Sequence, residues 1–145
     1  MQSAVQLATA VSPCRWLAEW ARIRDRELVA AARFDRAGYT RVLVDRTAAA
    51  ELWLLGWRAG QTTAIHDHAG CETTSIVVRG SLLEGRYEQV GLESARRIGE
   101  RALVERDLEP LDASSIHRVQ AIESAITLHL YAPRYRPGRT FAEAT

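Results

Sequence analysis

The chain has 145 residues, of which 47% are hydrophobic and 26% charged, and its formal net charge is +1. These values are typical of one globular domain over residues 1–145, and they exclude a strongly charged protein built to bind nucleic acid or an anionic membrane. Cys14 and Cys71 form no disulfide framework, and no apolar run approaches the ~18 residues of a membrane helix. Residues 1–11 lack the basic region and long apolar run of a signal peptide, so we expect a cytoplasmic protein.

Residues 1–37 form a segment that is predicted to be largely helical. Ser12 and Pro13 suit the N-cap and first turn of a helix that runs to about residue 34 and is interrupted near Asp25. An apolar stripe at helical spacing predicts the face that packs against the core. Its members are Trp16, Leu17, Trp20 and Ile23.

From Tyr39 onward the hydrophobic period changes to two, which indicates β-strands. Short strands are expected at 39–45, 49–57, 75–79, 82–90, 102–107, 115–120 and 125–131. The series predicts an all-β sandwich or barrel over residues 38–134. Pro133 and Pro137 should end regular structure, and the polar tail within 135–145 is expected to be loosely held.

Two of the four histidines, His66 and His68, are two residues apart in a segment that is predicted to be extended. Alternate side chains of an extended segment point to the same side, so both imidazoles can face one cation. His117, at the start of a strand-like run, is the candidate third ligand. Imidazole suits Zn, Fe, Cu and Ni, so the pattern predicts a metal site without determining the metal.

The stretch from Gly60 to Gly80 resembles the first motif of the cupin superfamily: Gly, five residues, His-x-His, three or four residues, Glu, six residues, Gly. Counting back from Gly80 puts Thr73 at the Glu position, and strand alternation then turns Glu72 away from the metal. We therefore expect the carboxylate of most cupins to be missing. A site of three neutral histidines keeps more of the metal's positive charge, which suits an anionic ligand such as a thiolate.

Four stretches between residues 39 and 133 give a narrower resemblance, to cysteine dioxygenase and its thiol dioxygenase relatives. They are Tyr39-Thr-Arg41-x-Leu-Val-Asp45, Leu55-Gly-Trp57-x-x-Gly60-x-x-x-Ala-Ile-His66-Asp-His68, Ile116-His117-Arg118-Val119 and Leu128-His129-Leu130-Tyr131-x-Pro133. The resemblance implies a cupin-type, jelly-roll-like β-barrel with a short N-terminal helical segment. It also implies an Fe(II)-dependent enzyme of cysteine metabolism that adds both atoms of O2 to L-cysteine, or a closely related thiol, and yields the sulfinic acid.

The resemblance assigns a metal site and a substrate site to particular residues. His66, His68 and His117 match the iron ligands of the family. Arg41 matches the arginine that holds the substrate carboxylate, and a guanidinium can grip a carboxylate with two hydrogen bonds. Tyr39 shares the strand face of Arg41 and matches the family pattern as well. The implied partners are therefore a small thiol and O2.

Thr127, His129 and Tyr131 match the family's Ser-x-His-x-Tyr relay, with threonine in place of serine. A histidine can orient a phenol, and the phenol can then hydrogen-bond dioxygen or the substrate. In animal members a cysteine is covalently linked to the relay tyrosine. Thr73 stands at that cysteine's position, so the cross-link is expected to be absent, and Cys71, two residues away, is not expected to replace it.

Two alternatives stay open at this point. Relatives that use 3-mercaptopropionate also resemble the chain, but they typically place another residue at the position of Arg41, which favours cysteine. A non-catalytic cupin that binds a metal and a small effector would account for the histidines, but not for Arg41 or the Leu-His-Leu-Tyr run. The sequence leaves the physiological thiol and the oligomeric state undetermined.

Overall fold

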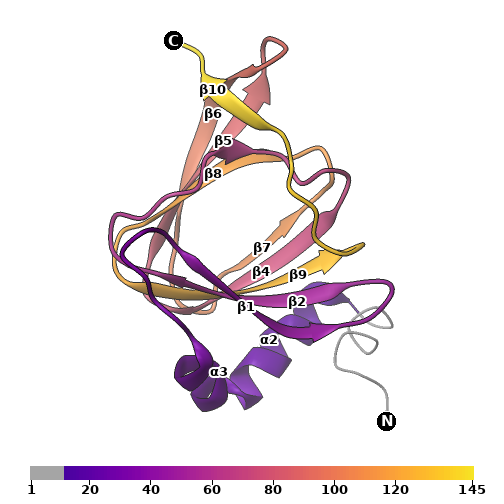
Figure 1. The fold of residues 1–145 in the computed structure, drawn as a ribbon, viewed down its shortest axis with the longest axis vertical. Coiled ribbons are helices and arrows are strands. Elements are labelled where there is room, and N and C mark those ends of the chain that lie inside the picture. Colours follow the sequence, from indigo (N-terminus) through magenta and orange to yellow (C-terminus); the bar gives the residue numbers. More distant parts are fainter. Residues whose placement is uncertain (1–11) are drawn as a thin grey trace.

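The computed structural model describes residues 12–145, and residues 1–11, where no signal peptide is expected, lie outside the described part. The described elements are α2 (Pro13–Ile23), α3 (Asp25–Ala31), β1 (Thr40–Arg46), β2 (Glu51–Trp57), β3 (Ile65–His66), β4 (Glu72–Arg79), β5 (Leu82–Gln89), β6 (Ser94–Leu103), β7 (Leu108–Leu111), β8 (Ile116–Ala121), β9 (Ala125–Ala132) and β10 (Thr140–Glu143). Neither helix is long and apolar enough to cross a membrane. The predicted all-β barrel with a short N-terminal helical segment is confirmed (Figure 1).

The strands form two sheets that enclose the interior of the barrel (Figure 1). The first sheet has the order β1-β2-β9-β4-β7, and its neighbouring strands are antiparallel. The second has the order β10-β3-β8-β5-β6 and closes on itself, because β10 pairs with both β3 and β6. Helices α2 and α3 cover the outer face of the first sheet, which leaves its inner face to line the interior.

The central strands of the first sheet, β2, β4 and β9, are largely buried on both faces, and their side-chain alternation separates the core from the cavity. Leu54 and Leu128 point outward and pack with Leu17 of α2, whereas Trp57 and Thr127 point inward. Both faces of β2 are therefore apolar or enclosed, which explains why the run over 49–57 is too apolar for an exposed strand.

Helix α2 begins as predicted, with Ser12 at the N-cap position and a proline in the first turn. The predicted interruption is also present, since α2 ends one residue before Arg24 and α3 begins at Asp25. Both carboxylate oxygens of Asp25 accept hydrogen bonds from Arg79 of β4, at 2.7 and 2.6 Å, which ties α3 to the sheet. The placement of Ile23 in the buried stripe is wrong, because this last residue of α2 is 62% exposed at the turn.

The expected strand over residues 102–107 is also wrong. Strand β6 ends at Leu103, and a turn follows in which Val104 donates to Asp107 Oδ2 at 2.8 Å and Arg106 has a φ of +73°. Most of β6 is exposed and polar, so it lacks the alternation that marks a strand in a sequence.

The tail within residues 135–145 was expected to be loosely held, but it contains the paired strand β10. Strand β10 pairs Thr140 with His66 of β3 and Ala142 with Ser94 of β6, and Phe141 is buried. A four-residue strand with one buried apolar side chain carries too little periodicity to be predicted. The tail therefore completes the second sheet next to the first histidine.

Leu128 offers a test of the core between the helices and the first sheet. This side chain is fully buried, so Leu128→Ala should lower the free energy of unfolding by about 2–5 kcal/mol. Urea denaturation would measure the loss. Leu92→Ala is the matched control, because Leu92 is 89% exposed and should change stability by less than about 0.5 kcal/mol. Equal effects of the two substitutions would contradict this assignment of the core.

Candidate metal centre and substrate pocket

A cavity of about 210 Å³ lies between the two sheets. Its walls come from both sheets and from the segment that follows β9, including Trp57, Val77, His117, Thr127 and Pro137. The volume is below the range of drug-sized ligand sites, so the cavity suits a small molecule.

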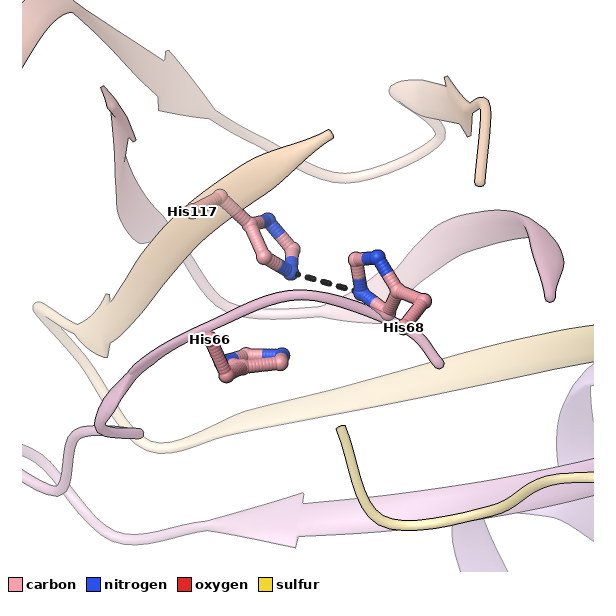
Figure 2. A group of neighbouring side chains, drawn as sticks. All are labelled: His66, His68 and His117. Carbon is pink, nitrogen blue, oxygen red and sulfur yellow. Dashed lines mark hydrogen bonds between the residues drawn. The ribbon is translucent and has the colours of Figure 1, made fainter. Parts of the chain in front are cut away.

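Three histidines converge on this cavity from the second sheet and the loop beside it. His66 lies in β3 directly opposite His117 in β8, and His68 follows two residues later. One ligand nitrogen from each ring can be chosen so that all three lie within 4.8 Å of one another. Figure 2 shows the rings turned toward each other, with the Nε2 atoms of His68 and His117 3.1 Å apart. The structure thus brings together the three histidines that the sequence singled out.

The loop between β3 and β4 holds His68 on the inner side. Asp67 accepts hydrogen bonds from the backbone N–H and the Nε of Arg139, both at 2.8 Å. The chain then turns through Ala69 and Gly70, which have φ angles of +50° and +81°. Glycine adopts this left-handed conformation without steric cost, which permits the turn. The middle residue of His-Asp-His therefore anchors the loop while both neighbours face inward.

Burial keeps the three imidazoles neutral. Loss of solvation lowers the pKa of His68 and of His117 to about 3 in each case, and it lowers the pKa of His66 as well. A neutral imidazole offers a nitrogen lone pair, which is the form that binds metal ions. Three such rings with ligand atoms this close fit one divalent transition-metal ion.

The structure agrees with the count back from Gly80, which puts Thr73 and not Glu72 at the position of the cupin glutamate. Glu72 is exposed, whereas Thr73 is buried, lines the cavity and lies directly opposite Tyr131 in the pairing of β4 with β9. The Cys71 thiol is directed elsewhere, since its Sγ contacts the Arg134 carbonyl oxygen at 3.3 Å. Thr73 is thus the residue paired with Tyr131, whereas Cys71 lies outside the lining of the cavity.

Arg41 of β1 points into the same cavity from the first sheet. Its Cζ lies 3.6 Å from the ring centroid of Tyr135, 5.0 Å from that of Trp53 and 5.6 Å from that of Tyr131. Its Nε and Nη2 atoms are buried and have no hydrogen-bond partner among residues 12–145. Aromatic rings stabilise the cation without using its N–H groups, which stay available to an anion.

The predicted relay residues line the cavity beside Arg41. The Thr127 hydroxyl accepts a hydrogen bond from Trp57 Nε1 at 2.9 Å and lies 2.7 Å from His129 Nε2. His129 stacks on Tyr131 with ring centroids 6.2 Å apart. Burial lowers the pKa of His129 to about 3 and raises that of Tyr131, so the ring is neutral and the phenol protonated at pH 7.

Tyr39 lies at the same end of the cavity. Its ring stacks on Trp57 with centroids 4.6 Å apart, and burial raises its pKa. It is close enough to Arg41 for the cation to counteract part of that rise. All eight residues that the sequence analysis singled out therefore line one cavity.

Three further residues at the site were missed by the sequence analysis. Glu84 and Glu109 line the cavity as buried carboxylates, and Tyr135 covers Arg41 from the segment after β9. Burial, together with a hydrogen bond to Glu84, raises the pKa of Glu109 to about 7. The sequence could have indicated that Glu84 points inward, because it follows the buried Leu82 by two residues and shares its face. Tyr135 lies outside any periodic run and had no such indication.

The fold and the site define a cupin-type barrel with three histidines that converge in its cavity. Solved structures share the fold at low identity. A conserved protein with a double-stranded β-helix domain from Klebsiella pneumoniae gives a TM-score of 0.64 at 18% identity, covering 81% of this chain and 89% of that chain. An RmlC-like cupin protein from Desulfovibrio desulfuricans gives 0.56 at 23% identity, covering 72% and 91%.

Sequence comparison narrows the class to one family. The family model of cysteine dioxygenase type I matches residues 13–144. Cysteine dioxygenase type 1 of Danio rerio is 32% identical over 125 residues, which cover 79% of this chain. The chain therefore belongs to the cysteine dioxygenase type I family, and the predicted family and cupin fold are confirmed. The matched region spans 61% of the length of the Danio rerio relative.

Proposed function

We propose that this protein is an Fe(II)-dependent thiol dioxygenase that converts L-cysteine, or a closely related thiol, to its sulfinic acid. His66, His68 and His117 would hold the metal. The observation that carries the proposal is the pairing of this neutral triad with Arg41, whose buried N–H groups lack partners among the described residues and line the same cavity. Membership of the family supports the reaction class.

The reaction balances without an external reductant. The thiol R–SH and O2 give R–SO2H, so both oxygen atoms end on sulfur and O2 accepts the four electrons that sulfur loses. When bound, Fe(II) would lower the thiol pKa and supply the redox chemistry that activates O2.

The residues of the chain would bind and orient the substrate. Arg41 would hold the carboxylate through Nε and Nη2, and the surrounding rings limit its rotation. Tyr131 would donate a hydrogen bond from its hydroxyl to dioxygen or to the substrate. Burial keeps this hydroxyl protonated. His129, placed by Thr127, packs on the Tyr131 ring and positions it. The apolar part of the walls, which includes Trp57, Val77 and Leu82, would limit the access of water to the thiolate.

A panel of thiols tests the proposed reaction. The iron-loaded protein should consume one O2 per L-cysteine and form cysteine sulfinic acid, measured with an oxygen electrode and by mass spectrometry. Cysteamine lacks the carboxylate and should fall in kcat/KM by about 30-fold or more, as expected when a buried charged hydrogen bond is lost. Uptake with 3-mercaptopropionate alone would contradict the cysteine assignment. The absence of uptake with every thiol would favour a non-catalytic metal-binding cupin.

A further inference from the structure

A buried carboxylate lies directly behind His117. Glu84 is in β5, which pairs antiparallel with β8, and its side chain is only 2% exposed. Its Oε2 is 2.9 Å from His117 Nδ1. A carboxylate oxygen accepts from an imidazole N–H, so from this contact we infer that Nδ1 of His117 carries the hydrogen. The Nε2 lone pair of His117 then faces the other two histidines.

Two arginines of the second sheet contact Glu84 and the neighbouring carboxylate of Glu109, which belongs to β7 of the first sheet. Arg86 Nε donates to Glu84 Oε1 at 2.8 Å, and Arg86 Nη2 donates to Glu109 at 3.0 Å. Arg101 contacts the second oxygen of Glu109 at 2.6 Å. A buried carboxylate is tolerated when it is paired and hydrogen-bonded in this way. Arg86 therefore contacts Oε1 of Glu84, and Oε2 is the oxygen that lies against the imidazole of His117.

We propose that Glu84 is a positioning residue of the metal centre, which holds His117 in the tautomer that presents Nε2 to the metal and strengthens it as a donor. The carboxylate that most cupins place on the metal would here act through a histidine. His66 has a weaker counterpart, since its Nδ1 lies 2.8 Å from the neutral Ala64 carbonyl oxygen. The proposal rests on the metal centre proposed above and is independent of which thiol is oxidised.

Glu84→Gln tests this proposal through metal affinity. His117 and Arg86 contact different oxygens of Glu84, and glutamine replaces one of these oxygens with an NH2 group that cannot accept. The affinity for Co(II), measured by competition with a chelator, should fall about 10- to 100-fold, the usual loss for an outer-shell partner. Glu88→Gln is the matched control, because Glu88 lies on the same strand, is 45% exposed and pairs with Arg96 away from the cavity. It should leave the affinity unchanged.

The imidazole tautomer separates positioning from a structural role. In the wild-type protein without metal, nitrogen NMR of labelled histidine should show the hydrogen of His117 on Nδ1, whereas Glu84→Gln should show a mixture of tautomers. A purely structural residue would lower the melting temperature without changing this spectrum in the folded protein. A wild-type His117 with its hydrogen on Nε2 would overturn the proposal, even if the variant failed to fold.

The remaining outcomes distinguish this proposal from the function it rests on. Equal losses in Glu84→Gln and Glu88→Gln would indicate a general charge effect and overturn the role of the contact. Wild-type affinity in Glu84→Gln would overturn it as well. In a further outcome, the wild type binds metal, Glu84→Gln binds it more weakly, and no thiol causes O2 uptake. This result would support the positioning role and reject the proposed dioxygenase.

Discussion

His117→Ala should abolish metal binding and reduce thiol-dependent O2 uptake to background. The substitution removes one of three neutral imidazoles whose ligand atoms lie within 4.8 Å of one another. It also leaves the Glu84 carboxylate without the imidazole that lies 2.9 Å from it. The loss of metal affinity should exceed the roughly 100-fold upper range for an outer-shell residue. Metal analysis of protein purified with added Fe(II) under anaerobic conditions would measure it.

His129→Ala provides the control for this loss. His129 lines the same cavity and is equally uncharged, but its Nε2 contacts Thr127 and its ring stacks on Tyr131. The variant should keep its iron while its kcat falls. If His117→Ala retained full iron content, a different residue would have to supply the third ligand.

Arg41→Ala should raise the KM for L-cysteine by about 30-fold or more while the iron content stays constant. Loss of a buried charged hydrogen bond costs about 2–5 kcal/mol, and each 1.4 kcal/mol is about tenfold. Steady-state O2 uptake over a range of cysteine concentrations would measure the change. Arg41→Lys should recover only part of the affinity, since lysine keeps the charge but lacks the planar fork that stacks on Tyr135.

Cysteamine gives this prediction its internal control. It carries the thiol and the amine without a carboxylate, so its KM should be nearly the same in the wild type and in Arg41→Ala. A parallel rise for cysteine and cysteamine would show that Arg41 shapes the pocket rather than binding the carboxylate. Loss of iron from the variant would likewise indicate a structural role.

Local periodicity was sufficient to predict the orientation of a functional side chain where its residue lies within a regular strand. The spacing of Thr127, His129 and Tyr131 at alternate positions places all three on the inner face of β9. The same rule separates exposed Glu72 from buried Thr73 in β4. Side-chain alternation is a property of the extended backbone itself, so these assignments needed no knowledge of neighbouring strands.

Periodicity did not reveal the strands that are exposed or very short. Strand β6 is mostly polar, and β10 buries only Phe141, so neither shows a clear two-residue pattern. The pairing of β10 with β3 and β6 nevertheless holds the tail beside His66. Such strands are stabilised by backbone hydrogen bonds to their neighbours, which a pattern of side chains does not report.

The sequence by itself determined the fold class and the face on which most candidate site residues lie. Only the tertiary structure decided which side chains meet: Glu84 reaches His117 because β5 pairs with β8, and Tyr135 covers Arg41 because the chain after β9 returns over the cavity. The physical reason is that alternation specifies the inward side of a strand, whereas register and the path of connecting segments specify the partner. The three histidines that the sequence singled out thus lie beside a buried carboxylate that comes from a neighbouring strand.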